Sequence, residues 1–181
     1  MTGSVSDATR RVAGVEQARR DAQSVTPDGE LVQVPIDGVR VRPAITHLDE
    51  RGSVCEIYDP AWGFTDEPLV YVYQTTIRPG QVKGWVLHLE QDDRLFFSLG
   101  DVKVVLFDVR VDSPTYESVN VLCFGESNRA LVRIPRGVYH ALQNVGRTDA
   151  VFVNSPTRAY RHEDPDKYRL PLDTDRIPYR F

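Results

Sequence analysis

From residue 31 onward, the chain is built of short apolar runs, each followed closely by a turn signal. The runs are rich in Val, Ile, Leu, Tyr and Phe and include LVYVYQTTI, GWVLHLE, KVVLFDVRV, SVNVLCF and AVFVNS. Stretches such as RPGQ, DSPT, GESN and NVGRTD separate them. Many short strands at close, regular spacing are typical of an antiparallel sandwich or barrel, and no βαβ spacing is visible. The sequence therefore predicts an all-β domain.

The two ends of the chain differ from this central part. Residues 1–30 are polar, and DATRRVAGVEQARRDAQSV could form one amphipathic helix before the turn at Pro27-Asp28-Gly29. We expect residues 1–30 to form an N-terminal arm, helical or irregular, and residues 31–181 to form one domain. The last stretch, from Ser155, mixes Pro, Asp, Arg and Tyr and predicts an irregular tail that wraps the barrel.

Composition narrows the class of protein. The net charge of −4 and the pI near 5.6 argue against a general nucleic-acid binder, which is usually basic. No apolar run approaches the roughly 20 residues that span a bilayer, and MTGSVSDATRR contains no apolar signal core. The two cysteines form no CxxC motif. We therefore expect a cytoplasmic protein with free thiols and no membrane or nucleic-acid partner.

The stretch GWVLHLEQDD, residues 84–93, raises the question of a site. If it is a strand, Val86, His88 and Glu90 share one face, and Trp85, Leu87 and Leu89 share the other. With His88 facing the barrel interior, the apolar Trp85 face points outward and needs a cover. A partner subunit would supply it, so we expect a homodimer.

A second stretch, IPRGVYHALQN, contains Pro135-x-Gly137-x-x-His140 and resembles the second motif of the cupin superfamily. The first cupin motif is matched in part, by Gly84, His88, Glu90 in place of a second histidine, Asp93 near the acid position and Gly100. An isolated histidine on an apolar strand is more often a hydrogen-bonded core residue than a working group. Two histidines aimed at one cavity favour a site. The resemblance implies a cupin jelly-roll barrel of antiparallel strands.

Several further stretches resemble one branch of the cupins, the dTDP-4-dehydrorhamnose 3,5-epimerase family. They run from about residue 45 to residue 165, and FDVRVDSPTY followed by PxGxxH is the most specific combination. The matching positions are Asp49 to Glu56, Gln74, Arg94-Leu95, residues 107–116, Pro135 to His140, and Thr157 to Tyr160.

This resemblance implies a metal-free enzyme without a cofactor, acting on a dTDP-4-keto-6-deoxy sugar. A histidine takes a proton next to the 4-keto group, and a tyrosine on the opposite face returns one. By position, His88 is the base, His140 a second polar group and Asp108 a residue that orients an imidazole. The substrate contacts that we predict involve Arg51, Glu56, Gln74, Trp85, Glu90, Arg94, Tyr139 and Tyr160. The nucleotide is expected to reach across the dimer interface.

The chain departs from the family pattern at three places. Trp85 stands where the family has an arginine, three residues before the base, and Asn154 stands where it has the catalytic tyrosine. The family aspartate that pairs with the base lies beyond Phe181, so Asp173 or Asp175 could substitute for it. Tyr139 or Tyr160 could replace the missing acid.

Three functions are therefore open. The first is a nucleotide-sugar epimerase or isomerase, because histidine is a base of near-neutral pKa that suits proton abstraction next to a carbonyl. The second is a metal-dependent cupin in which His88, Glu90 and His140 hold the ion. The third is a sugar-nucleotide-binding cupin that has lost the reaction, which Trp85 and Asn154 motivate.

Overall fold

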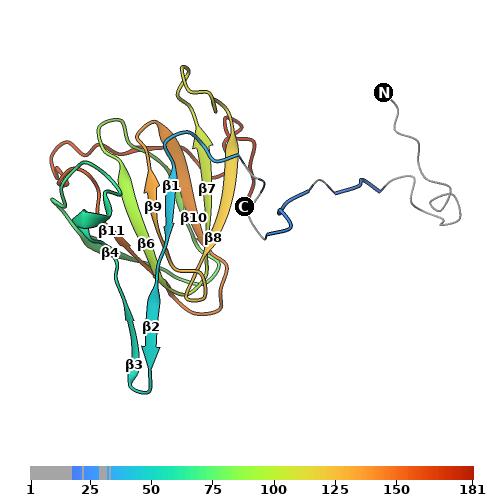
Figure 1. The fold of residues 1–181 in the computed structure, drawn as a ribbon. Coiled ribbons are helices and arrows are strands. Elements are labelled where there is room, and N and C mark those ends of the chain that lie inside the picture. Colours follow the sequence, from blue (N-terminus) through green and yellow to red (C-terminus); the bar gives the residue numbers. More distant parts are fainter. Residues whose placement is uncertain (1–17, 22, 29–31, 33) are drawn as a thin grey trace, which may run out of the picture. The chain divides into compact units, whose positions relative to one another are not determined.

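The computed structural model describes residues 18–21, 23–28, 32 and 34–181 (Figure 1). The chain divides into two compact units, Met1–Val34 and Pro35–Phe181. In the first unit, the helix expected within residues 7–25 falls largely outside the described residues, and residues 18–21 and 23–28 form no helix. Among the described residues, no helix has both the length and the apolar character needed to cross a membrane.

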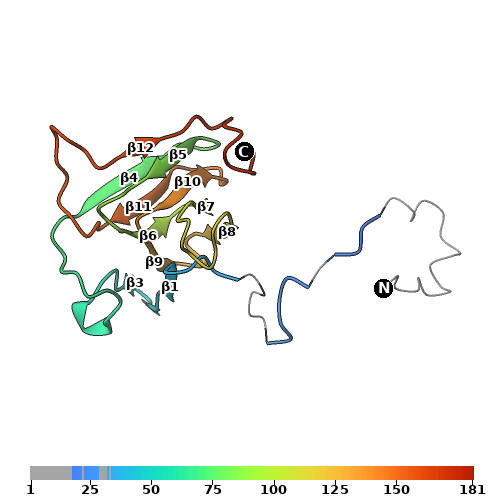
Figure 2. The same cartoon turned by 90° about the horizontal axis from the view of Figure 1, so that it is seen from above.

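The second unit is almost entirely antiparallel β-structure, as the spacing of the apolar runs predicts. Two sheets have five strands each, in the orders β1-β9-β6-β11-β4 (the β6 sheet) and β12-β5-β10-β7-β8 (the β10 sheet). Seen from above, the two sheets lie side by side as two layers (Figure 2). The strands are β1 Arg40–Pro43, β2 Thr46–Asp49, β3 Gly52–Cys55, β4 Tyr73–Ile77, β5 Val82–Leu87, β6 Asp93–Leu99, β7 Val102–Asp108, β8 Val119–Phe124, β9 Ala130–Ile134, β10 Val138–Asn144, β11 Ala150–Asn154 and β12 Tyr168–Arg169, and one 3₁₀ turn, η2, spans Pro60–Trp62.

The main core fills the space between the two sheets. Alternation along β7 explains how it forms: Val104 and Leu106 point into this space, whereas Val105 and Phe107 point to the outer face of the β10 sheet. The inner set continues with Leu95, Phe97, Val132, Ile134, Leu142 and Phe152. Because the apolar side chains occupy only part of the inter-sheet space, the rest is left for the polar residues described below.

The outer face of the β10 sheet is covered by the chain's own C-terminal tail. The Trp85 side chain is fully buried there, with ring centroids 6.5 Å from Tyr179 and 5.5 Å from Phe181. Ile177 is buried in the same cluster, and β12 extends the sheet by pairing with β5. The tail is otherwise irregular, as expected. The expectation that a partner subunit covers Trp85 is therefore wrong.

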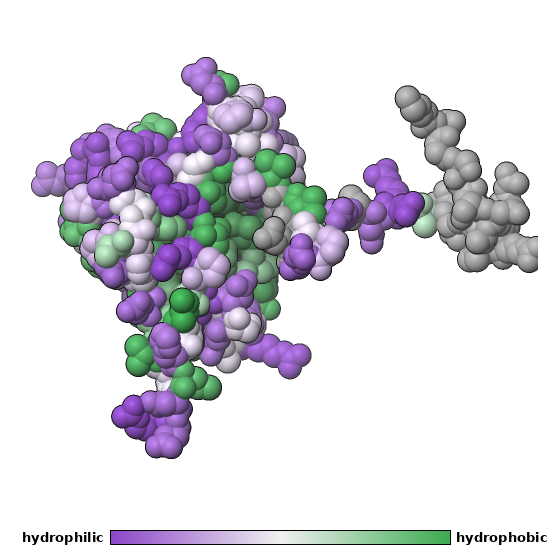
Figure 3. Space-filling model, in the orientation of Figure 1, coloured by the Kyte–Doolittle hydropathy of each residue, from purple (hydrophilic) through white to green (hydrophobic). Residues whose placement is uncertain are grey.

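A two-stranded hairpin, β2–β3, projects away from both sheets (Figure 1). The apolar side chains on it and just before it have little cover: Leu48 and Val54 are 81% and 68% exposed, and Ile45, which precedes β2, is 68% exposed. The space-filling view shows apolar patches in this region, toward the bottom (Figure 3). Such exposure is unusual for a surface that faces only water.

Candidate active site

A cavity of about 310 Å³ opens between the β6 and β10 sheets. Most of its polar lining comes from the strands, with His88 just after β5. The polar side chains that line it include Tyr73, Lys83, His88, Asp93, His140 and Asn154. The β6 sheet supplies Tyr73, Asp93 and Asn154, and the β10 sheet supplies Lys83 and His140. The two histidines predicted from the sequence therefore share one cavity.

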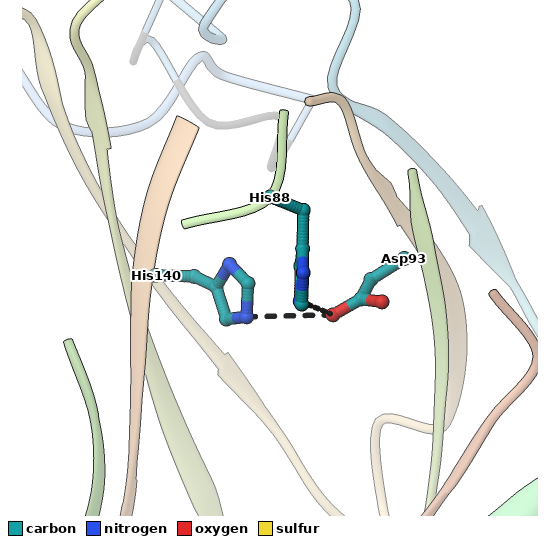
Figure 4. Close-up of side chains that lie close together, drawn as sticks. All are labelled: His88, Asp93 and His140. Carbon is teal, nitrogen blue, oxygen red and sulfur yellow. Dashed lines mark ion pairs between the residues drawn. The ribbon is translucent and has the colours of Figure 1, made fainter. Parts of the chain in front are cut away.

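A single carboxylate oxygen joins the two imidazoles (Figure 4). The Nε2 atoms of His88 and His140 both lie 3.4 Å from Oδ2 of Asp93. The ring centroids are 5.6 Å apart, and all three residues are buried. Close spacing of this kind between a carboxylate and two imidazoles is more typical of a functional site than of a core.

The PxGxxH motif positions both histidines. Gly137 has a φ of +77°, in the left-handed region, and a Cβ there would lie 2.6 Å from Cγ of Arg110. Its N–H donates to the carbonyl of His88 at 2.8 Å. Three residues later His140 lies opposite Val86 in the β5–β10 pairing. One turn thus fixes the backbone at residue 88 and directs the side chain of residue 140.

The other nitrogen of His88 is held by the tail. Its Nδ1 hydrogen-bonds to the backbone carbonyl of Asp166. The Asp166 carboxylate accepts the backbone N–H groups of Leu89, Glu90 and Gln91 at 2.9, 2.8 and 3.1 Å. Because a carbonyl only accepts, Nδ1 carries the proton and the lone pair of a neutral His88 lies on Nε2. The backbone of Asp166 therefore holds one nitrogen of this imidazole, and the carboxylate that pairs with the base is that of Asp93, rather than of Asp173 or Asp175.

The environment separates the pKa values of the two histidines. Burial lowers the pKa of His88, but the hydrogen bond and charge of Asp93 outweigh this effect and leave that pKa above its ordinary value. Burial dominates at His140 and lowers its pKa to about 4. Burial also opposes ionisation of Asp93, yet the two imidazoles hold its pKa well below the usual range. His88 is thus the stronger base, and His140 stays neutral.

Asn154 lies on the cavity wall and contacts a tyrosine that sequence reasoning missed. Its Nδ2 donates to the hydroxyl of Tyr73 at 2.8 Å, while its Oδ1 accepts the backbone N–H of Arg94 at 3.3 Å. The two residues face each other in the β11–β4 register. Burial raises the pKa of Tyr73 to about 12, with a further contribution from the charge of Asp93.

Asp108 does not orient an imidazole, contrary to the expectation. Its fully buried carboxylate accepts hydrogen bonds from Arg110, Ser113 and Thr115. Burial raises the pKa of Asp108, but these bonds outweigh it and lower the pKa to about 2. The DxRxxSPT motif thus forms a hydrogen-bonded corner in the connection from β7 to β8. The contact with the imidazoles that was expected of Asp108 is made by Asp93.

Four other predicted substrate contacts point away from the cavity. The buried guanidinium of Arg94 is occupied by groups that include Thr65 and the carbonyls of Glu67, Pro68 and Ser155, so it is not a free phosphate ligand. Tyr139 and Trp85 belong to the outer cluster of the β10 sheet. Gln74 lies between Tyr73 and Thr75, which both line the cavity, so alternation directs it to the opposite face.

The remaining predicted residues lie outside the cavity or at its mouth. Glu90 and Tyr160 line a smaller adjoining pocket together with Tyr73, His88 and Lys167. The Glu90 carboxylate pairs with Arg158 and Arg161 at 2.7 and 3.1 Å. Arg51 is on the projecting hairpin, paired with Asp49, and Glu56 follows β3.

His88, Asp93 and His140 could also hold a metal ion. Each offers one ligand atom, and these atoms lie within 4.8 Å of one another. Two imidazoles and a carboxylate are a ligand set used by several divalent metals. In this ligand set the carboxylate belongs to Asp93. The expectation that Glu90 would supply it is therefore wrong.

Sequence reasoning named Asp93 only as an acid near a cupin motif position, without a role in the site, and missed several other cavity residues. Asp93 and Tyr73 lie at strand starts, and alternation from Leu95 and Thr75 would have assigned both to the inner face. No local signal identified the cationic residues on the cavity wall, because their convergence depends on the pairing of β5 with β12. These residues are Lys83, Lys167 and Arg169.

Comparison with known proteins agrees with this architecture. The profile of the family described as dTDP-4-dehydrorhamnose 3,5-epimerase matches residues 33–175. The probable low-salt glycan biosynthesis epimerase Agl13 of Haloferax volcanii is 36% identical over 140 residues, which are 76% of this chain and 89% of that protein. The spore coat polysaccharide biosynthesis protein SpsL of Bacillus subtilis is 34% identical over 150 residues, 81% of this chain and 96% of that protein.

A solved structure extends the likeness to the fold. The dTDP sugar isomerase from Desulfovibrio desulfuricans G20 superposes with a TM-score of 0.76 at 25% identity, covering 82% of this chain and 93% of that one. The predicted all-β cupin fold is thereby confirmed. With the family profile covering most of the domain, the chain belongs to the dTDP-4-dehydrorhamnose 3,5-epimerase family.

Proposed function

We propose that this protein is a nucleotide-sugar epimerase that abstracts a proton next to the 4-keto group of a dTDP-4-keto-6-deoxy sugar in polysaccharide or glycan biosynthesis. The observation that carries the proposal is the shared cavity in which Asp93 joins His88 and His140. Family membership and the two curated relatives support the class of reaction.

The chemistry follows from the protonation states. Neutral His88 accepts the proton from the carbon at Nε2, and the C–H electrons move into the carbonyl to give an enolate. Asp93 stabilises the imidazolium that forms. Neutral His140 keeps one N–H; carried on Nε2, the nitrogen beside Asp93, it would face the cavity, where a donor to the developing oxyanion is most effective.

The diphosphate of the substrate needs cationic partners. Lys83, Lys167 and Arg169 line the cavity, and they are better placed than the occupied Arg94. Burial lowers the pKa of Lys167, and the nearby cations Arg169 and Lys83 lower it further, an effect that a bound diphosphate would reverse. We assign these three residues to the phosphate groups.

The proposal includes a homodimer. The exposed apolar side chains of the β2–β3 hairpin, and the position of Arg51 on it, support an exchange of this hairpin between subunits. Arg51 and Glu56 would then reach the nucleotide of the partner subunit, which accounts for their distance from the cavity of their own chain.

The test is solvent exchange. Incubation with a dTDP-4-keto-6-deoxy sugar in D2O, before and after dialysis against a chelator, should give deuterium at C3 or C5 in both samples. Exchange that disappears with the chelator and returns with an added divalent metal would favour the metal-dependent reading. Tight dTDP binding without any exchange would favour a binding protein that has lost the reaction.

A further inference from the structure

We infer that Tyr73 is the acid that returns a proton to the sugar on the face opposite His88, in place of the tyrosine that the chain lacks at position 154. The inference rests on the proposed function. It concerns a residue on a different strand, β4, from the one on which the family carries its acid.

The positions of the two groups support opposite faces. Tyr73 lies at the start of β4 in the β6 sheet, whereas His88 directly follows β5 and its partner His140 lies on β10, both in the β10 sheet. Both sheets line one cavity. A sugar bound between them has the imidazoles on one side and the phenol on the other.

The hydrogen bonding of Tyr73 leaves its proton available. Arg94 N–H donates to Oδ1 of Asn154, which fixes the amide so that Nδ2 faces Tyr73. The phenol oxygen therefore accepts this bond, and its own hydrogen is free to point to another acceptor. With a pKa raised to about 12, the phenol remains protonated at neutral pH.

Asn154 thus positions the hydroxyl of Tyr73 and is not itself an acid. It lies directly opposite Tyr73 in the register, so the hydroxyl is held one strand away from the position where the family has a hydroxyl. The other tyrosines that we considered are less suited. Tyr139 is on the outer face, and Tyr160 lines only the adjoining pocket, not the cavity that holds His140 and Asp93, and its ring packs against His162.

The proton balance is closed by solvent. His88 takes one proton from carbon, Tyr73 gives one to the same carbon from the other face, and the electron pair of the enolate forms the new C–H bond. His88 then carries an extra proton and Tyr73 lacks one. Both side chains also line the adjoining pocket, and Tyr73 is 36% exposed, so water can restore each of them.

Tyr73→Phe separates the two half-reactions. With a dTDP-4-keto-6-deoxy sugar in D2O, followed by ¹H NMR, deuterium wash-in catalysed by His88 should stay within about tenfold of the wild type. Inversion should fall by about 10²-fold or more, the usual contribution of a positioned acid. The matched control is Tyr179→Phe, which removes a hydroxyl on the outer face and should change neither rate.

A rescue sharpens the experiment. Adding Asn154→Tyr to Tyr73→Phe returns a phenol to the family position and should recover part of the inversion. Unchanged inversion in Tyr73→Phe would overturn the inference, and so would a parallel loss of wash-in and inversion in a folded variant. Absence of wash-in in the wild type would instead overturn the proposed function itself.

Discussion

Asp93 is the residue on which the electrostatics of the cavity depend. One buried carboxylate lies 3.4 Å from two imidazoles whose pKa values move in opposite directions. Because the three groups titrate together, a change at any of them alters the protonation of the others. Asp93 was visible in the sequence only as an acid near a cupin motif position, since its contact with both rings depends on two strands from different sheets.

Asp93→Asn tests this coupling. Loss of the carboxylate removes the main influence that raises the pKa of His88, so that pKa should fall. The acid limb of kcat/KM should move to lower pH, and the maximal rate should decrease because His88 becomes a weaker base. NMR titration of the His88 imidazole, beside a pH–rate profile, measures both effects. An unmoved acid limb would contradict the assignment of His88 as the titrating base.

At the scale of single elements, much could be predicted from the sequence. Alternation in KVVLFDVRV predicts the two faces of β7, and the PxGxxH turn directs His140 into the cavity. The role of Asp108 could not be predicted, because a family motif identifies a position and not its hydrogen-bond partners. The cover over Trp85 was also missed, since an irregular C-terminal tail has no periodicity that indicates where it folds back.

The DxRxxSPT corner should contribute to stability. Asp108→Asn leaves Arg110 with an uncompensated charge next to a buried site, at a cost of about 3 kcal/mol in the free energy of unfolding. The folded pKa of Asp108 is about 2, below its ordinary 3.8, so its contribution is present above about pH 4 and is lost as the pH falls toward 2. Urea denaturation of both proteins at pH 7 and pH 3 should show the difference shrinking. A constant difference would contradict the linkage, and Asp175→Asn, an exposed ion-pair partner, is the control.

The β5–β10 pairing is a second element open to test. A Cβ at Gly84 would lie 2.2 Å from Cβ and 2.6 Å from Cα of Ala141, so the strands cannot keep their spacing with a larger residue. Gly84→Ala should lower the melting temperature and slow the reaction together, because the same pairing positions His140 and Val86. A wild-type melting temperature and rate in Gly84→Ala would contradict the requirement for a glycine at this contact.

At the scale of the whole molecule, the β2–β3 hairpin exposes apolar side chains that no other part of the described chain covers. Its Leu48 and Val54 side chains are more exposed than a strand normally leaves them. The sequence predicts a dimer for another reason, the face of Trp85, which the tail covers instead. In the dimer that we propose, the hairpin supplies the contact surface instead, and Arg51 and Glu56 on and after it complete the site of the second copy.

Charges on the hairpin should therefore dissociate the protein. Leu48→Asp combined with Val54→Asp should convert a dimer to a monomer in sedimentation velocity and weaken dTDP binding by about tenfold or more. Val111→Asp is the matched control. Val111 is 75% exposed and lies in the connection between β7 and β8, outside the hairpin. A dimer that survives the paired substitution would place the interface elsewhere.

The central claim is that His88 removes a proton from the sugar. The most direct measurement is the rate of deuterium incorporation at C3 and C5 of a dTDP-4-keto-6-deoxy sugar by His88→Asn, compared with His162→Asn, an exposed histidine in the C-terminal tail. The asparagine can still donate to the carbonyl of Asp166 but cannot accept a proton as a base. We predict incorporation reduced by about 10³-fold in His88→Asn and unchanged in His162→Asn. Incorporation at the wild-type rate in a folded His88→Asn protein would contradict the account.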